Sequence, residues 1–139
     1  MASIGIAPFV LKDASFVVDA DNYETNVSQV EFTATTSQVE WKGLTPTAVF
    51  TDSGAPTWAC VLSYAQDWTT PDSLSQYLMD HQGEKVTAVF GPQGAVAGDA
   101  IFTVDLIIQA GPIGGSEGAV AVGSVTLGCD GAPVRSQVP

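Results

Sequence analysis

The sequence predicts a mainly β protein, a β-sandwich or partly closed barrel with one flanking α-helix. Three observations support this prediction. Apolar and polar residues alternate over several stretches, most regularly over 101–109. Clusters of turn-forming residues, such as 51–56, separate those stretches. A single segment, 70–83, has the three-to-four-residue spacing of an amphipathic helix.

The first expected strand is 27–35, in which an apolar face alternates with a polar one. The next apolar pair, Val39 and Trp41, falls in the opposite phase, which predicts a turn or a bulge at 36–38. Two more strands lie on either side of the turn cluster and complete a set of antiparallel hairpins: 47–50 and 58–64.

The helix is expected to start at an N-cap Thr70, with Pro71 and Asp72 in its first turn, and to end at Gly83. Its apolar stripe is the expected packing face: Leu74, Tyr77, Leu78 and His81. Three strands should follow, the last with a bulge at Gly123 and a turn at the end of the chain: 85–90, 101–109 and 120–127.

The chain has 139 residues, which fits a single domain over 1–139. Fifteen acidic residues face four basic ones, giving a formal net charge of −11. Nucleic-acid affinity comes mainly from lysine and arginine at phosphates, so this balance argues against a DNA- or RNA-gripping role and against an anionic membrane surface. Only 14% of residues are charged, against about 25% in an average domain, which favours contact with copies of the chain or with partners. Neither a secretory signal nor an apolar run of membrane-spanning length is evident.

The residue pattern predicts no enzyme, no cofactor and no metal centre. The one histidine, His81, stands at the end of the helix stripe without a recognisable catalytic partner. Residues 19–24 are faintly similar to the start of a calcium loop, but Glu24 and Val30 replace its glycine and glutamate, which leaves a solvated turn or an incidental cation site. The segment 111–118 lacks the Lys-Ser/Thr pair of a phosphate-binding loop and is expected to be a mobile hairpin loop.

Cysteines and tryptophans leave alternatives open. Cys60 and Cys129 form either one bridge or two thiols, and the apolar run around Cys60 favours thiols. Trp41, Trp58 and Trp68 suit a sugar-binding platform, but packing in a core or an interface is the more common use of such side chains.

Three stretches carry a family resemblance: a hairpin with strands at 26–32 and 39–43, the helix at 71–78 with the strand end 88–92, and the last strand with its turn at 120–133. In these the sequence resembles the major tail tube proteins of long-tailed, siphovirus-type bacteriophages. The short N-terminus departs from that family, because it leaves little arm to reach a neighbouring ring. The resemblance implies a β-sandwich subunit that forms hexameric rings, which stack into a hollow tube for DNA ejection and have no active site.

The resemblance also implies partners and a location. The chain would bind copies of itself, with tape measure and tail terminator or tip proteins at the tube ends, and DNA would pass without specific binding. It would reside in the virion, in the phage tail, after assembly in the host cytoplasm, where structural disulfides are rare. Two alternatives stay open: a phage capsid decoration protein, and an immunoglobulin-like carbohydrate-binding module.

The strand pattern supplies candidate residues for such a tube. Polar residues opposite the apolar strand faces are candidates for the lumen wall, where acidic side chains repel DNA over about one Debye length: Glu31, Thr33, Thr35, Glu40 and Asp105. Glycines of the loop 111–118 are candidates for a flexible contact between subunits: Gly111, Gly114, Gly115 and Gly118.

Overall fold

The computed structural model describes residues 2–94 and 96–139. Within these residues it has ten β-strands and one α-helix, which confirms the mainly β fold with a single helix. The elements in chain order are β1 (Ser15–Val18), β2 (Asp21–Asn22), β3 (Val27–Thr35), β4 (Gln38–Lys42), β5 (Val49–Ser53), β6 (Thr57–Ala65), α1 (Leu74–Asp80), β7 (Lys85–Gly91), β8 (Ala100–Ile107), β9 (Val122–Cys129) and β10 (Val134–Gln137).

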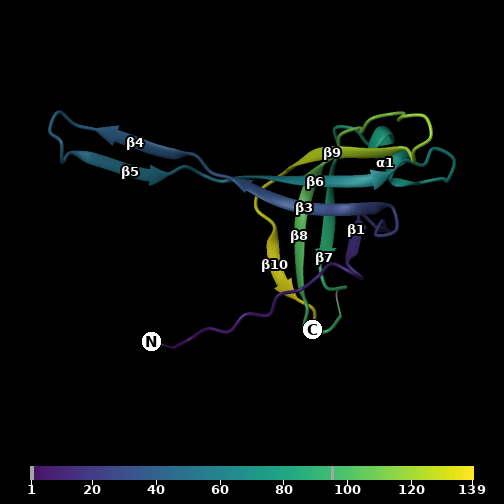
Figure 1. The fold of residues 1–139 in the computed structure, drawn as a ribbon, viewed down its shortest axis with the longest axis horizontal. Helices are drawn as coiled ribbons and strands as arrows, with labels where there is room; N and C mark the ends of the chain where they lie inside the picture. The colour runs from purple at the N-terminus through teal and green to yellow at the C-terminus, as the bar shows by residue number, and fades with distance from the viewer. Residues whose placement is uncertain (1, 95) are drawn as a thin grey trace.

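The main sheet is antiparallel, with the strand order β2-β1-β7-β8-β9-β6-β3 and with β10 paired to β8. β8 and β9 join through only two residue pairs, Leu106 with Cys129 and Ile107 with Gly128, so the sheet bends there. The bend produces two layers, with β3, β6 and β9 running across the direction of β1, β7 and β8 (Figure 1). No pairing joins the end strands β2 and β3 within the described part of the chain, so the fold is a β-sandwich whose sheet stays open.

A hydrophobic core fills the space between the two layers. β1, β7 and β8 contribute Phe16, Ala88 and Leu106, while β6 and β9 contribute Leu62 and Leu127. All five are almost completely buried. The alternation predicted for the strands therefore places one face of each layer in a shared interior.

Three aromatic rings connect the layers. The ring of Phe90 on β7 lies 6.3 Å from that of Phe16 on β1 in an edge-to-face arrangement, and 5.9 Å from that of Phe32 on β3. Aromatic pairs of this kind contribute about 0.5–1.5 kcal/mol beyond the area they bury. Because Phe32 lies on the last strand of the sheet order, its contact holds one layer against the other.

The helix begins later than predicted. Its N-cap is Ser73, and Asp72 before it has a left-handed backbone with φ of 58°, so the predicted start at Thr70 and the place of Pro71 and Asp72 in the first turn are wrong. The Ser73 hydroxyl donates a hydrogen bond to the carbonyl oxygen of Asp67 at 2.6 Å, which holds the preceding segment in a turn. The contacts of the preceding turn thus outweigh the helix start signal at Thr70.

The stripe of the helix packs on the core. Leu74, Tyr77 and Leu78 are buried, and the Tyr77 ring lies 5.8 Å from that of Tyr23, just after β2. His81 is the C-cap residue and is half-buried, and its ring stacks on Tyr77 at 4.2 Å. The helix therefore packs against the sandwich from Leu74 to its C-cap residue.

The predicted strand 27–35 coincides with β3, and the predicted strand 58–64 lies within β6. β3 pairs with β6, however, and β4 pairs with β5. The predicted hairpin between 26–32 and 39–43 is therefore wrong, because the chain continues through 36–37 without turning back. The change of phase marks a break between two strand pairs, and 51–53, expected in a turn, pair with β4.

Two predictions for the C-terminal part are also wrong. β9 pairs with β6 without a register shift, so there is no bulge at Gly123. The ring of Tyr64 occupies the space in which a Cβ of residue 123 would lie, and Gly123 continues the buried face of Val125 and Leu127. The chain does not end in a turn after β9, because β10 follows and pairs with β8.

Candidate functional site

The most distinctive surface is a two-stranded arm formed by β4, β5 and the turn between them, residues 38–53. It continues from β3 and β6 and extends away from the sandwich (Figure 1). β4 and β5 pair over five residues, from Gln38 with Ser53 to Lys42 with Val49. All ten residues of the two strands are exposed. The arm therefore lacks the covering layer that the rest of the sheet has. An isolated two-stranded ribbon of this kind is only marginally stable in water.

The two faces of the arm differ in chemistry. Trp41 lies directly opposite Phe50, and Val39 precedes Trp41 by two residues, so these three share one face. They are 63%, 57% and 55% exposed respectively. Asp52 pairs with Val39 and is the charged residue on this face. The opposite face is mainly polar, with Val49 as its apolar residue, and includes Glu40, whose carboxylate lies 3.2 Å from the Lys42 ammonium group. The arm is therefore amphipathic, with an apolar face that nothing in the described chain covers.

The base of the arm is narrow. The Gly54 N–H donates to the carbonyl oxygen of Ser37 at 2.6 Å. A Cβ at Gly54 would lie 2.9 Å from the Ser37 hydroxyl, closer than real Cβ atoms come. Glycine therefore permits the two chain segments to approach at this point, where the pairing of the arm and the pairing of β3 with β6 are separated.

An apolar groove of about 410 Å³ lies beside the base of the arm. Its lining is aromatic, aliphatic and proline, with Glu31 as the one charged residue among those that line it. It gathers residues that are distant in the sequence: Phe9, Leu11, Val30, Glu31, Phe32, Trp58, Phe90, Pro92, Phe102 and Pro133. The groove has no local signal in the sequence, because the fold brings its lining residues together from distant parts of the chain.

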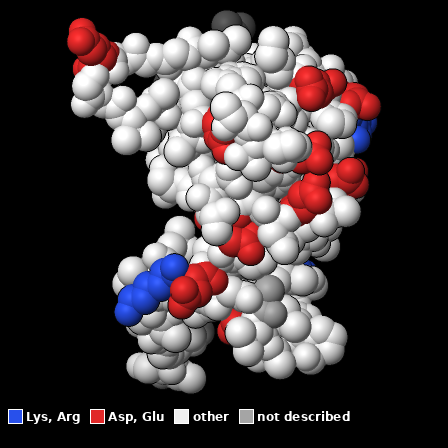
Figure 2. Space-filling model, turned by 90° about the vertical axis from the view of Figure 1, so that its right-hand side faces the viewer, with Lys and Arg blue, Asp and Glu red and all other residues white. Residues whose placement is uncertain are grey.

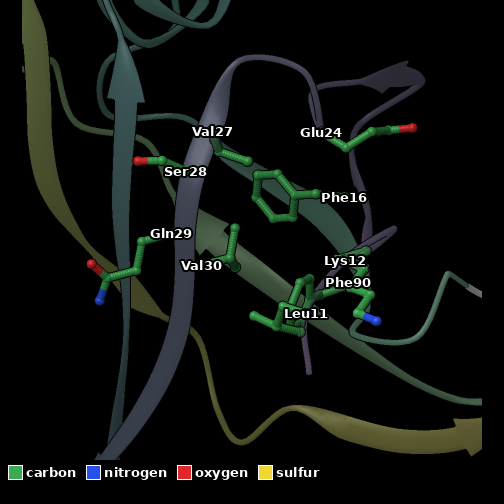
Figure 3. Close-up of a pocket in the computed structure, with 10 residues that line it drawn as sticks. Leu11, Lys12, Phe16, Glu24, Val27, Ser28, Gln29, Val30 and Phe90 are labelled. Carbon is green, nitrogen blue, oxygen red and sulfur yellow. The ribbon is translucent and has the colours of Figure 1, made fainter. Parts of the chain in front are cut away.

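A smaller cavity of about 160 Å³ adjoins the groove between the N-terminal segment, β1 and β3. Figure 3 shows Leu11, Phe16 and Val30 on one side of β3, with Ser28 and Gln29 on the other. The described residues that line the cavity form no cluster suited to catalysis, since Lys12 and Glu24 are the charged ones and do not form an ion pair with each other. The cavity is a gap at the edge of the hydrophobic core.

The predicted lumen residues lie in different parts of the molecule. Glu31, Thr33 and Thr35 lie on the face of β3 opposite Val30 and Phe32, and Glu40 lies on the polar face of the arm. Asp105 lies on β8 in the other layer, where its carboxylate accepts a hydrogen bond from the Thr87 hydroxyl at 2.9 Å. The structure therefore groups the three β3 residues and separates Asp105 from them.

The loop 111–118 is tied to the sandwich at its middle. The Gln66 side chain donates to the carbonyl oxygens of Gly114 and Val122, both at 2.8 Å, and accepts from the Gly114 N–H at 3.0 Å. Gly111 lies against the Tyr64 hydroxyl, where a side chain at residue 111 has no room. The other candidate glycines, Gly115 and Gly118, are exposed. The role of Gln66 was not visible in the sequence, because nothing local marks a contact across 48 residues.

Several titratable groups respond to burial or to hydrogen bonding. Burial raises the pKa of the Cys60 thiol to about 12, with a further contribution from the nearby Cys129. Both cysteines are free thiols. Burial also raises the pKa of Tyr23 to about 12, with the charges of neighbouring aspartates adding to it. Hydrogen bonds from the side chain of Thr70 and from the backbone of residues 69–70 lower the pKa of Asp67 to about 2.

The end of the sandwich opposite the arm is strongly acidic. Figure 2 shows Asp and Glu side chains spread over this end with few Lys or Arg side chains among them. Among the described residues, no group of three or more His, Cys, Asp or Glu side chains is arranged to hold a metal ion. The helix found in residues 2–94 and 96–139 is too short to cross a membrane. The surface features with distinct chemistry are thus the arm, the groove and the acidic end.

Comparison with known proteins identifies a likeness of fold. A chain from a solved structure described as the virion of a native gene transfer agent (GTA) particle is similar to this chain, with a TM-score of 0.64. The match covers 89% of this chain and 95% of that chain at 12% sequence identity, so it concerns the fold alone. No protein-family model and no curated protein matches the sequence.

Proposed function

We propose that this chain is a structural protein of a phage-like virion that assembles with copies of itself, and that its assembly is the tail tube. The observation that carries the proposal is the amphipathic arm, because its apolar face calls for a partner surface. The fold likeness to a chain of a virion particle, over nearly the full length of both chains, supports the same class of protein.

Within this proposal the subunits form hexameric rings that stack into a hollow conduit for DNA. The polar face of β3 with Thr33 and Thr35 lines the lumen, whereas Glu31 on the same strand lies at the groove. A net charge of −11 for each subunit makes the wall repel phosphates, so DNA slides without binding. The chain acts by shape and charge and performs no chemical reaction. Tape measure, terminator and tip proteins bind the tube ends.

Sedimentation velocity and negative-stain electron microscopy of the purified chain test the proposal. We expect rings or tubes as the concentration rises from micromolar to millimolar. A protein that stays monomeric over this range in several salts would refute self-assembly. Discrete trimers without tubes would support the capsid decoration alternative, and binding of glycans by a monomer would support the carbohydrate-binding alternative.

Matched variants connect the result to the arm. Trp41→Ser combined with Phe50→Ser removes apolar side chains from one face, and Glu40→Gln combined with Thr51→Ser alters the opposite face of the same strands. We expect the first variant to lose assembly and the second to retain it. Equal assembly by both variants would show that the apolar face of the arm is not needed for self-assembly.

A further inference from the structure

We infer that the apolar face of the arm binds the apolar groove of a second copy of this chain, so that the two surfaces form one head-to-tail contact. This inference rests on the proposed self-assembly and names the surfaces that carry it. Trp41 and Phe50 enter the groove, and Phe9, Trp58 and Phe102 receive them.

The two surfaces match in chemistry. The groove is lined by aromatic, aliphatic and proline side chains over about 410 Å³, and the arm presents two aromatic rings side by side with Val39. Aromatic side chains bury about 150–250 Å² each when fully covered. Trp41 and Phe50 are 63% and 57% exposed, so covering them would contribute roughly 200–300 Å² of the roughly 800 Å² per partner that a stable interface needs. Aromatic anchors that fill a pocket are typical of the centre of an interface.

The geometry requires that the arm and the groove belong to different molecules. Phe32 and Trp58 of the groove lie on β3 and β6, the strands that lead directly into the arm. The arm points away from the sandwich (Figure 1). To reach its own groove it would have to reverse within 36–37 and 54–56, which would break the hydrogen bond between Gly54 and Ser37.

Charge also favours this contact between copies. The arm, residues 38–53, holds Glu40, Asp52 and Lys42, a net charge of −1, which leaves −10 of the total −11 for the rest of the chain. Two sandwich bodies of such charge repel each other, especially at their acidic ends. The arm face that carries Trp41 and Phe50 has one charged residue, Asp52, and the groove that it meets has a single charged lining residue, Glu31.

A head-to-tail contact has a definite consequence for assembly. The growing assembly keeps one free arm at one end and one free groove at the other after every addition, so growth continues until a ring closes or a helical filament extends. A contact of arm with arm would instead stop at a dimer. The arm-to-groove contact therefore fits a protein that builds rings or tubes.

Photo-crosslinking within the assembled protein tests the contact directly. The photoreactive residue p-benzoylphenylalanine replaces Trp41 in one preparation and, as a matched control on the opposite face, Thr51 in another. Assemblies contain equal amounts of light and isotopically heavy chains, so mass spectrometry of digested products distinguishes contacts between copies from contacts within one. We expect residue 41 to crosslink between copies to the peptides that hold Phe9, Trp58, Phe102 or Pro133, at least fivefold more often than residue 51.

A charge-insertion series provides a second readout. Phe9→Glu combined with Leu11→Glu places two carboxylates at the groove on exposed side chains, where the core is not disturbed. Ile4→Glu combined with Ile6→Glu adds the same charge to the same segment outside the groove lining. We expect the first pair to raise the concentration needed for assembly at least tenfold and the second pair to leave it within twofold.

The outcomes separate the two proposals. Crosslinks from residue 41 to another arm or to the loop 111–118, or unchanged assembly of the Phe9 and Leu11 variant, would overturn the arm-to-groove contact and leave the proposed self-assembly standing. Failure of the unaltered chain to assemble at any concentration would overturn the proposed function itself. Equal amounts of the groove variant and a Trp41→Asp variant should form dimers that do not grow, since one intact arm meets one intact groove.

Discussion

Two neighbouring strand pairs, β3 with β6 in the sandwich and β4 with β5 in the arm, follow one another along the chain but differ in what covers them. β3 and β6 place Val30 and Leu62 opposite each other under a second layer, and both are buried. β4 and β5 place Trp41 opposite Phe50 in the same way, but no second layer lies over them. Alternation along a strand therefore defines an apolar face. Whether that face is buried depends on the rest of the fold or on another molecule.

The largest expected difference between the two regions is in the cost of truncating a side chain. Leu62→Ala should lower the free energy of unfolding by about 2–5 kcal/mol, because it leaves a cavity in the core. Val49→Ala in the arm should change it by no more than about 0.5 kcal/mol. Urea denaturation at concentrations where the chain is monomeric measures both. Similar losses would mean that the arm is covered within the same chain.

A second prediction concerns close packing inside the sandwich. Gly123→Ala should destabilise the protein by about 1–3 kcal/mol, because the new Cβ would lie 2.9 Å from the Tyr64 ring. Gly128→Ala on the same strand is the control, since its nearest neighbour, the Ile107 side chain, lies at an ordinary 3.8 Å. Thermal unfolding compares the two variants. A tolerated alanine at 123 would show that Tyr64 has room to move.

The third prediction uses the exclusion of water from the core. The folded protein keeps the Cys60 proton up to a pKa of about 12, while an unfolded thiol loses it near 9.0, so stability should fall as pH rises between these values. The slope from one such group is at most about 1.4 kcal/mol per pH unit. Cys60→Ala should flatten the decline between pH 9 and 10, below the usual pKa of tyrosine. Denaturation curves at half-unit intervals measure the slope, and an unchanged slope would contradict the assignment to Cys60.

The smallest expected effect is in an exposed segment of the sandwich that, unlike the arm, is held by polar contacts. Hydrogen bonds from the Thr70 side chain and the backbone N–H groups of Thr69 and Thr70 lower the Asp67 pKa to about 2 from 3.8. These contacts contribute stability above pH 3.8, and it is lost as pH falls through 2. Asp67→Asn should make the acid limb less steep. Tyrosine fluorescence during acid titration follows it, with Asp80→Asn as a control, and an identical limb would contradict the prediction.

Strong local patterns carried most of what could be predicted about the sandwich. The strand 27–35, the strand predicted at 101–109 and found as β8 (Ala100–Ile107), and the buried stripe Leu74, Tyr77 and Leu78 each have a periodic apolar face that the core uses. β10 has no such face, since all its residues are exposed, and it forms because it pairs with β8. The sequence contains no local signal for that pairing.

The arm and the groove show the limit of such patterns more clearly. The phase change after Thr35 was visible, but it fits a turn as well as a break between two strand pairs, and only the partners β5 and β6 decide between them. The groove depends on Phe9, Trp58, Phe102 and Pro133, which are far apart in the chain. Asp72 likewise has a backbone conformation that a neighbouring turn imposes against a good local helix start.

The close approach of Gly54 to Ser37 has a mechanical consequence. The arm is a lever roughly 20–25 Å long, from the rise of about 3.3 Å per residue, and its pivot is this single narrow point. A rotation of about 10° there displaces the tip by roughly 4 Å, about the spacing of neighbouring strands. A Cβ at residue 54 would lie 2.9 Å from the Ser37 hydroxyl and 3.2 Å from the Ser37 carbonyl oxygen, so the two segments would have less room at this point. One glycine therefore sets the direction in which the arm reaches, and with it the position available to anything that the tip holds.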